Sequence, residues 1–377
     1  MRRIILNSYQ NKNWPEFTWD NDILLPTLSS VRNLQVKLLG KMENLGFDLR
    51  NEAVFETLTI DVIKSSEIEG EILNPDQVRS SIAKRLGMDI SGLPDSDRNV
   101  DGMVDLMMDA VHNYDKPLTT ERLFDWHSAL FPTGRSGLQK ITVGNWRNDA
   151  TGPMLVVSGP LGKERVHFQA PDSSQVPAEM EKFIEWFNLP GNIEPVLKAG
   201  LAHLWFVTIH PFDDGNGRIA RALTDMLLAR SDGSPQRFYS MSSQIRLQRK
   251  GYYDILEQTT KGDLDVTGWL SWFIDCLFNA LNSSDFILSN VLNKAEFWKR
   301  HTSTILNYRQ QLMINKLLNG FVGKLTTSKW AKLTKCSQDT ALRDIQDLIG
   351  KNILMKEGSG GRSASYGLNN TYAKIRI

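Results

Sequence analysis

Apolar residues recur at helical spacing along most of the chain, and the alternating runs typical of strands are few. The residues that start and stop these apolar stretches predict helices over about 28–45, 51–69, 177–188, 194–209, 218–230, 249–260 and 267–282. Loops predicted at 87–97 and 132–137 bound a further pair of helices. Between 145 and 171 the sequence becomes rich in Val, Gly and Pro, with short runs in which apolar and polar residues alternate. This pattern predicts a β-hairpin with an exposed tip at 158–163. We therefore expect a mainly α protein.

The C-terminal region has a pattern of its own. Predicted helices near 310–318, 328–334 and 338–350 are followed by two apolar runs that flank the Gly-rich segment 358–363. Three helices and a Gly-rich hairpin in so short a segment are typical of a winged helix-turn-helix domain, which we place at 300–377. Such domains bind DNA or act in protein interaction, and the pattern leaves both kinds of partner open.

Composition bounds the remaining possibilities. The 377 residues are 41% hydrophobic and 23% charged, enough to build two or three domain cores, so disorder is excluded for most of the chain. Only two cysteines occur, Cys276 and Cys336, in segments predicted as different helices, so neither a disulfide framework nor a cysteine metal site is supported. No apolar run is long enough for a signal peptide or a membrane span, and we expect a cytoplasmic protein with no membrane partner.

Charge is distributed unevenly along the chain. The net charge is +1, yet residues 309–377 contain twelve Lys/Arg and four Asp/Glu, which gives +8 there and leaves −7 for the remainder. If the C-terminal region binds DNA, residues 337–343 would face the major groove, while Lys356 and Arg362 would contact the backbone.

The strongest candidate for chemistry is the segment His210-Pro-Phe-Asp-Asp-Gly-Asn-Gly-Arg-Ile-Ala-Arg221, which lies between two predicted helices. The proline ends the first helix and leaves His210 at its edge, where an imidazole can accept a proton near neutral pH. The glycines can take positive φ, so backbone N–H groups converge on an anion at the start of the next helix. Arg218 and Arg221 share one face of that helix and can grip a polyphosphate, while Asp214 can hold Mg²⁺ between phosphate oxygens.

Each of these features alone is ordinary, since Gly-Asn-Gly usually forms a turn and neighbouring arginines are usually solvated. Their combination within twelve residues is specific, and it resembles throughout the motif of the Fic family, His-x-Phe-x-Asp/Glu-Gly-Asn-Gly-Arg-x-x-Arg. Fic proteins are mostly α-helical enzymes that transfer AMP from ATP to Tyr, Thr or Ser hydroxyls of target proteins. The resemblance implies a Fic catalytic core over 113–285, preceded by an N-terminal helical region over 1–112.

The resemblance also implies roles for individual residues. His210 would be the general base, Asp214 the Mg²⁺ ligand, and Phe212 the anchor of the loop in the core. Asp213 falls at the variable position and is given no role beyond capping. The nucleotide phosphates would be bound by Gly215, Asn216, Gly217, Arg218 and Arg221. The implied cofactors are therefore ATP and Mg²⁺.

Two further segments resemble parts of the family's target and nucleotide sites. The hairpin 154–168 is similar to the Fic flap, which aligns a target segment by strand addition, so we expect a target-protein hydroxyl to be presented along it. Candidates for nucleotide or substrate contact there, with hairpin packing an equal alternative, are Val166, His167 and Phe168. Tyr252 and Tyr253 begin a segment that resembles the one closing the adenosine pocket.

Control of the site is implied by a second motif. Ser65-Ser-Glu-Ile-Glu-Gly70 resembles the Ser/Thr-x-x-x-Glu-Gly/Asn motif of the Fic inhibitory helix, here expected over about 51–70. In relatives the glutamate pairs with the second motif arginine, so Glu69 would pair with Arg221, with Ser65 bracing the motif and Gly70 ending it. An occupied arginine denies the γ phosphate its partner and presents a like charge, so ATP could not settle in line for transfer.

The sequence thus predicts an adenylyltransferase that modifies another protein or itself and is restrained by Glu69. Two alternatives stay open. In the first, the same site catalyses the reverse reaction, hydrolytic removal of AMP from a modified protein, with Glu69 positioning the water. In the second, the protein is a transcriptional regulator whose Fic-like core only senses nucleotide and which acts through 300–377. A homodimer, common among similar proteins, is the assembly that the resemblance suggests. Glu67 and Glu71, beside the inhibitory glutamate, are expected to be surface charges.

Overall fold

The computed structural model describes residues 7–88, 93–150, 152–159, 165–191, 193–318, 321, 323–357 and 364–369. Contacts within the chain define two compact units. Unit 1 takes Met1–Gly46, Val54–Met88 and Pro94–Ser284, and unit 2 takes Phe47–Ala53, Asp89–Leu93 and Asp285–Ile377. Most described residues are helical, which confirms the predicted mainly α class. Among them, no helix combines the length and hydropathy that crossing a bilayer requires.

Unit 1 is built from helices with well-defined starts. Asp20 caps the first of them and Thr119 caps another, each accepting hydrogen bonds from backbone N–H groups of the first turn. The α-helices that contribute to this unit are α1 (Asn21–Glu43), α2 (Phe47–Ile68), α3 (Pro75–Leu86), α4 (Arg98–His112), α5 (Thr120–Leu130), α6 (Val176–Asn188), α7 (Pro195–Ile209), α8 (Asn216–Asp232), α9 (Met241–Leu247), α10 (Arg249–Thr260) and the first part of α11 (Thr267–Arg300). Short 3-10 turns lie at Ser8–Gln10 and Ser173–Gln175.

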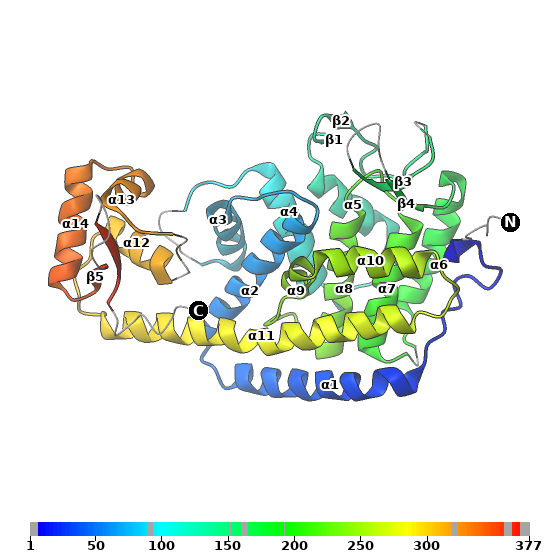
Figure 1. Ribbon diagram of the computed structural model, residues 1–377, viewed down its shortest axis with the longest axis horizontal. Helices are drawn as coiled ribbons and strands as arrows, with labels where there is room; N and C mark the ends of the chain where they lie inside the picture. Colours follow the sequence, from blue (N-terminus) through cyan, green and yellow to red (C-terminus); the bar gives the residue numbers. More distant parts are fainter. Residues whose placement is uncertain are drawn as a thin grey trace. The chain divides into compact units, whose positions relative to one another are not determined.

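The centre of unit 1 is the pair α7 and α8, which lie side by side (Figure 1). α7 is apolar around most of its circumference, and nearly all of its residues are buried. At Gly200 an added Cβ would lie 3.0 Å from both Leu270 and Phe273, so the missing side chain lets α11 approach α7 closely. Because α7 and α8 are fixed by this packing, the ends of the short segment that connects them, 210–215, are fixed as well.

Two β-hairpins precede α6. In the first, β1 (Arg135–Ser136) pairs with β2 (Gln139–Lys140), so part of the segment predicted as a plain loop is a small hairpin. In the second, β3 (Leu155–Ser158) pairs with β4 (Arg165–Gln169), which confirms the hairpin predicted from the sequence. The predicted tip lies partly outside the described residues, since 160–164 are not among them.

Most helix predictions are confirmed, but two helices, α3 and α9, were not predicted, and α11 was predicted too short. Pro75, which was expected only to prevent continuation of the preceding helix, is the first residue of α3 and follows the capping residue Asn74. α1 begins at Asn21, seven residues before the predicted start at 28. α9 was not predicted, because its seven residues are too few to show a period. α11 was expected to end at 282, at a run of Asn and Ser, yet it continues to Arg300. The hydroxyls of Ser283 and Ser284 donate to carbonyls of their own helix, so these residues do not break it.

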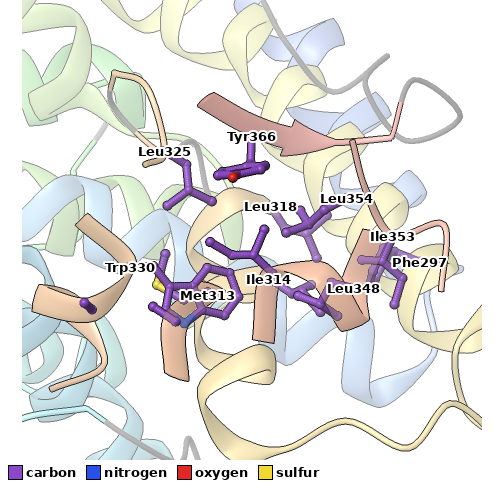
Figure 2. Packing of buried hydrophobic residues seen from close by; sticks show 13 residues of the cluster. Phe297, Met313, Ile314, Leu318, Leu325, Trp330, Leu348, Ile353, Leu354 and Tyr366 are labelled. Atoms are coloured by element: carbon purple, nitrogen blue, oxygen red, sulfur yellow. The ribbon is translucent and has the colours of Figure 1, made fainter. Parts of the chain in front are cut away.

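Unit 2 has its own hydrophobic core. Its elements after α11 are α12 (Tyr308–Leu318), α13 (Thr327–Leu333), α14 (Gln338–Gly350), β5 (Leu354–Glu357) and β6 (Ser365–Leu368). β5 pairs antiparallel with β6, and Leu325 forms a bridge to Tyr366 on the other side of β6. Figure 2 shows the side chains that these elements bury together, among them Met313, Trp330 and Leu348. The predicted Gly-rich segment 358–363 lies outside the described residues, and so does Arg362.

Candidate active site

His210 closes α7 in a left-handed conformation, with φ of +53°. Proline at position 211 cannot continue the helix, so the chain turns here, as the sequence predicts. The imidazole Nδ1 lies 3.2 Å from the carbonyl oxygen of Val207, a contact that requires a proton on Nδ1. Burial lowers the pKa of His210 below its ordinary value. At neutral pH the ring is therefore uncharged, and Nε2 is the atom that can accept a proton.

Arg147 holds the chain on both sides of His210. Its Nε donates to the carbonyl oxygen of His210 at 2.8 Å, and its backbone N–H donates to Pro211 O at 3.0 Å. The buried guanidinium also contacts the Asp149 carboxylate and the Pro171 carbonyl. These contacts fix the turn against the segment that precedes β3. Sequence reasoning missed this residue, because a lone arginine after Trp146 carries no periodic or motif signal.

The middle of the motif is braced from inside. Asn216 accepts a hydrogen bond from Phe212 N at 3.0 Å and donates to Phe212 O at 2.7 Å. Phe212 is buried and its ring stacks on His127 at a centroid distance of 4.2 Å, so the predicted anchoring contact is present. Both ends of the Asn216 amide are thus used within this loop, so its predicted part in phosphate binding falls to its backbone N–H. What the start of α8 offers an anion is the backbone N–H groups of its first turn.

The two motif aspartates have different surroundings. Asp213 accepts a hydrogen bond from Thr142 N at 2.8 Å, which ties the preceding loop to the motif. Asp214 accepts from Gly215 N at 2.6 Å and from the Ser136 hydroxyl at 2.5 Å, while its side chain remains 45% exposed. Ser136 belongs to the small hairpin β1–β2, which the sequence did not predict. Asp214 is thus the carboxylate at the mouth of the site, oriented by a serine from a distant segment.

Arg221 is 2% exposed and is held by the C-terminal part of α2. Its Nε donates to the Ser65 hydroxyl at 2.8 Å, and its Nη2 donates to Ser65 O at 2.9 Å. Nη2 also lies 2.8 Å from Glu69 Oε1. The remaining nitrogen, Nη1, is buried without a hydrogen-bond partner among the described residues. A buried guanidinium with one unsatisfied side has unused capacity to bind an anion.

Arg218 has a carboxylate partner that the sequence did not predict. Its Nη1 lies 2.9 Å from Glu71 Oε2, so Glu71 is not a simple surface charge as expected. The guanidinium also lies over the Phe131 ring at 4.9 Å, and its Nε is buried without a partner in the described part of the chain. Glu67 is also more than a surface charge, since its partly buried carboxylate pairs with both Lys64 and Arg246. Both motif arginines are therefore paired with glutamates that follow Ser65.

The start of α8 is shaped for close approach. A Cβ added at Gly217 would lie 2.2 Å from Glu69 Oε1, so the carboxylate occupies space that only glycine leaves open. Gly215 has φ of +82°, and a Cβ there would lie 2.9 Å from the Phe131 ring. Glu69 is thus seated directly on the backbone cradle that the sequence predicts for phosphate.

α10 holds the end of α2 in this position. Arg249 Nε donates to Ile68 O at 2.7 Å, and the Tyr253 hydroxyl lies 3.4 Å from Glu69 Oε2. Tyr252 was expected beside nucleotide, but its ring is buried and its hydroxyl lies 2.8 Å from His203 Nε2. Only Tyr253 of this pair stays exposed beside the site, at 37%.

The flap residues are mostly used in packing. Phe168 is buried and meets Tyr9 edge-on. His167 Nδ1 lies 2.5 Å from Glu257 on α10, so this side chain connects β4 to α10. Val166 is 49% exposed. Of the three candidates for substrate contact, Val166 has the most exposed side chain.

The donor set fits a magnesium-bound triphosphate better than a protein-held metal. Among the described residues, no group of three or more His, Cys, Asp or Glu could hold a metal ion. A single exposed carboxylate, Asp214, suits Mg²⁺, which keeps waters and takes most other ligands from phosphate oxygens. The buried nitrogens without partners, Arg221 Nη1 and Arg218 Nε, mark where anionic oxygens would be received.

Comparison with known families identifies this arrangement. Residues 117–228 match the Fic/DOC family. These residues form a Fic/DOC domain. Residues 8–88, which include α1, α2 and α3, match a different family, a domain of unknown function termed DUF4172. Ser65 and Glu69 therefore belong to this second region, and the arginine they contact belongs to the Fic domain.

Relatives of the Fic domain include proteins named protein adenylyltransferase Fic. Those of Drosophila willistoni and Drosophila melanogaster are both 34% identical to this chain over 105 residues, 27% of its length. The chain spans only about a fifth of the length of these relatives, 20% in each. Among solved structures, a Fic family protein from Desulfovibrio desulfuricans superposes with a TM-score of 0.52 over 92% of this chain and 96% of that one. At 19% identity this likeness concerns the fold, and it extends beyond the Fic domain.

Proposed function

We propose that this protein is a protein adenylyltransferase that uses Mg²⁺-ATP and is restrained by its own Glu69. The proposal rests on the position of the Glu69 carboxylate, which lies against the backbone of Gly217 and pairs with Arg221. A carboxylate held there imitates the anion that the cradle is shaped for. The Fic/DOC match and the naming of the Drosophila relatives support transfer of AMP as the reaction.

In the transfer, ATP lies with its phosphates along the first turn of α8. The γ phosphate replaces Glu69 at Arg221, and the β phosphate meets Arg218 and the α8 backbone amides. Mg²⁺ bound to Asp214 would neutralise charge on the phosphate oxygens. His210 Nε2 takes the proton of the target hydroxyl as its oxygen bonds to the α phosphorus, and the bond to the β phosphate oxygen breaks to release pyrophosphate.

The target segment is proposed to add to the outer edge of β3. β4 is already paired on one side with β3 and connected through His167 to α10, so the edge of β3 facing away from β4 is the one that can receive another strand. Val157 and Leu155 expose part of their side chains there, and an extended segment of the target can cover them.

Restraint involves two charges. Glu69 denies Arg221 to the γ phosphate, and Glu71 competes in the same way for Arg218. Each carboxylate occupies an arginine that a phosphate would otherwise bind and places a like charge beside it, so both oppose a triphosphate in this cradle, to an extent that solvent screening of the partly exposed glutamates reduces. Ser65 and α10 hold α2 in place, which keeps the effective concentration of Glu69 high.

The test is incorporation of label from ATP carrying ³²P at the α phosphate, with the full chain and Mg²⁺. Glu69→Gly should raise labelling of the chain or of added protein by about 10-fold or more, since the γ phosphate regains Arg221. His210→Ala in the same background should abolish it. Glu67→Gln, which removes a neighbouring charge that pairs with Lys64 and Arg246 and with neither motif arginine, is the matched control and should leave labelling unchanged. Undiminished labelling by the His210 variant would exclude the mechanism.

A further inference from the structure

The C-terminal part of unit 2 has an element order that neither family match covers, since both end before residue 229. It runs from α12 through the short bridge at Leu325 to α13, α14, β5 and β6, and Leu325 pairs with Tyr366 on β6. This is the order and pairing of a winged helix, in which the helix after the tight turn is the one that enters the major groove. We propose that α14 reads duplex DNA, a function separate from nucleotide transfer at His210.

The exposed face of α14 has the composition of a base-reading surface. Its exposed side chains recur at helical spacing. Asp347 is one of them but is paired with Lys351, and the remainder form a stripe that comprises Gln338, Asp339, Leu342, Arg343 and Gln346. Gln pairs with adenine, Arg with guanine and Asp with the cytosine amino group, and an apolar side chain meets the thymine methyl. Every member of the stripe thus has a complement on a base edge.

The other acidic residues of α14 are neutralised by neighbouring elements. Asp344 is buried, and it accepts hydrogen bonds from Arg309 Nε at 2.7 Å and from Asn307 at 2.8 Å. Asp347 lies 2.5 Å from Lys351 Nζ and 2.7 Å from Gln310 Nε2. These pairings remove most of the repulsion that α14 would otherwise exert on phosphate.

Two lysines are placed to contact the DNA backbone beside α14. Lys332 on α13 and Lys335 in the turn before α14 are both exposed, and neither has an ion-pair partner in the described parts of the chain. The net charge of +8 over 309–377 acts in the same direction. A protein or acidic peptide partner could use the charge, but it would not require a stripe of base-complementary side chains.

Lys335 is the more informative of the two. It has φ of +51°, a conformation that glycine or asparagine would adopt at lower cost. A lysine in the turn between α13 and α14 is therefore kept at the expense of backbone strain. Such an outlier points toward a function for the side chain.

The experiment uses the full chain and a randomised duplex library of about 25 base pairs, a little over two turns of DNA. Selection should enrich a consensus, and fluorescence anisotropy then measures affinity for the selected duplex and for an unrelated one. Arg343→Ala should weaken binding to the selected duplex roughly 5- to 100-fold and relax the preference at one base pair. Lys332→Ala should weaken both duplexes alike, roughly 5-fold, and reduce the slope of log affinity against log salt by about 1.

Lys335→Gly separates binding from folding. The variant relieves the left-handed backbone, so its melting temperature should not fall, yet its affinity for both duplexes should drop roughly 5-fold. The matched control is Lys12→Ala with Lys37→Ala, two exposed lysines of unit 1, which should bind as the wild type does. His210→Ala should also bind normally, so failure here is distinguishable from failure of the proposed transfer. Absence of any enriched sequence, or α14 variants that bind like the wild type, would overturn the proposal.

Discussion

The pairing of Glu71 with Arg218 leads to a quantitative prediction about ATP affinity. Before β phosphate can engage Arg218, the ion pair at 2.9 Å must be broken. The Glu71 carboxylate is 38% exposed, so solvent screens the pair, and its contribution should be at the level of a surface salt bridge, about 0.2–1 kcal/mol. Glu71→Gln should therefore tighten ATP binding by about 1.5- to 5-fold.

Glu69 should matter more, because it is somewhat less exposed than Glu71, at 31% against 38%, and its carboxylate also lies against the Gly217 backbone. Arg221 is 2% exposed, and hydrogen bonds to charged groups in such surroundings contribute about 1.5–3 kcal/mol. Glu69→Gly should then tighten ATP binding by about 10- to 150-fold. If each glutamate opposes a different phosphate, the double variant should show the product of the two effects, within about 0.5 kcal/mol.

Isothermal titration calorimetry with a non-hydrolysable ATP analogue and Mg²⁺ measures all four dissociation constants under one set of conditions. Glu67→Gln again serves as the control, because its carboxylate pairs with Lys64 and contacts neither motif arginine. If Glu71→Gln leaves the dissociation constant for the ATP analogue unchanged in both the wild-type and Glu69→Gly backgrounds, then Glu71 does not oppose phosphate binding at Arg218. Its role would then be structural only.

Three further predictions concern protons, the metal ligand and stability. Because burial lowers the pKa of His210, a pH profile of labelling by Glu69→Gly should show activity that persists below pH 6.5 and falls only as the pH drops through the lowered pKa. A loss of labelling centred above pH 6.5 would contradict this prediction. Ser136→Ala removes the 2.5 Å hydrogen bond that orients Asp214, so the Mg²⁺ concentration for half-maximal labelling should rise by about 3- to 10-fold with little loss at saturation; an equal loss at all Mg²⁺ concentrations would argue against orientation. Burial raises the pKa of Asp61 from 3.8 to about 7, so the folded protein retains a proton that the unfolded chain releases, and stability falls as pH rises across that window. Asp61→Asn should stabilise the protein at pH 8 by roughly 2–4 kcal/mol in chemical denaturation, and by nothing near pH 4.

The elements of the fold could be predicted where their cause is local. The helical period of 194–209, the proline that follows it and the glycines at 215 and 217 together predict a helix, a turn and a second helix start, and all three are present, with positive φ at Gly215. Anion binding at that helix start stays a prediction. Errors arose where the local pattern was short or ambiguous. α9 is too brief to show a period, and α11 passes through Asn and Ser residues that usually end helices.

Contacts across the chain could not be predicted in the same way. Glu71 and Arg218 are separated by 147 positions, and nothing in the neighbourhood of either residue specifies the other. The same holds for Ser136 on Asp214 and for Arg147 on His210. The motif places Asn216 at the phosphate site, but it does not reveal that its side-chain amide bonds at both ends to the Phe212 backbone.

By itself, the sequence of this protein determined which chemical groups lie close together: an imidazole, a carboxylate, two arginines and a glycine-rich turn within twelve residues. The turn is predictable because it depends on local backbone preferences. Only the tertiary structure decided which atoms of these groups are available. Contacts of α2 with α8 place Glu69 on Gly217, and contacts of α10 with α2 and α7 bury Tyr252 and leave Tyr253 exposed. Burial and hydrogen-bond partners arise from segments that are distant in sequence, so no local pattern contains them.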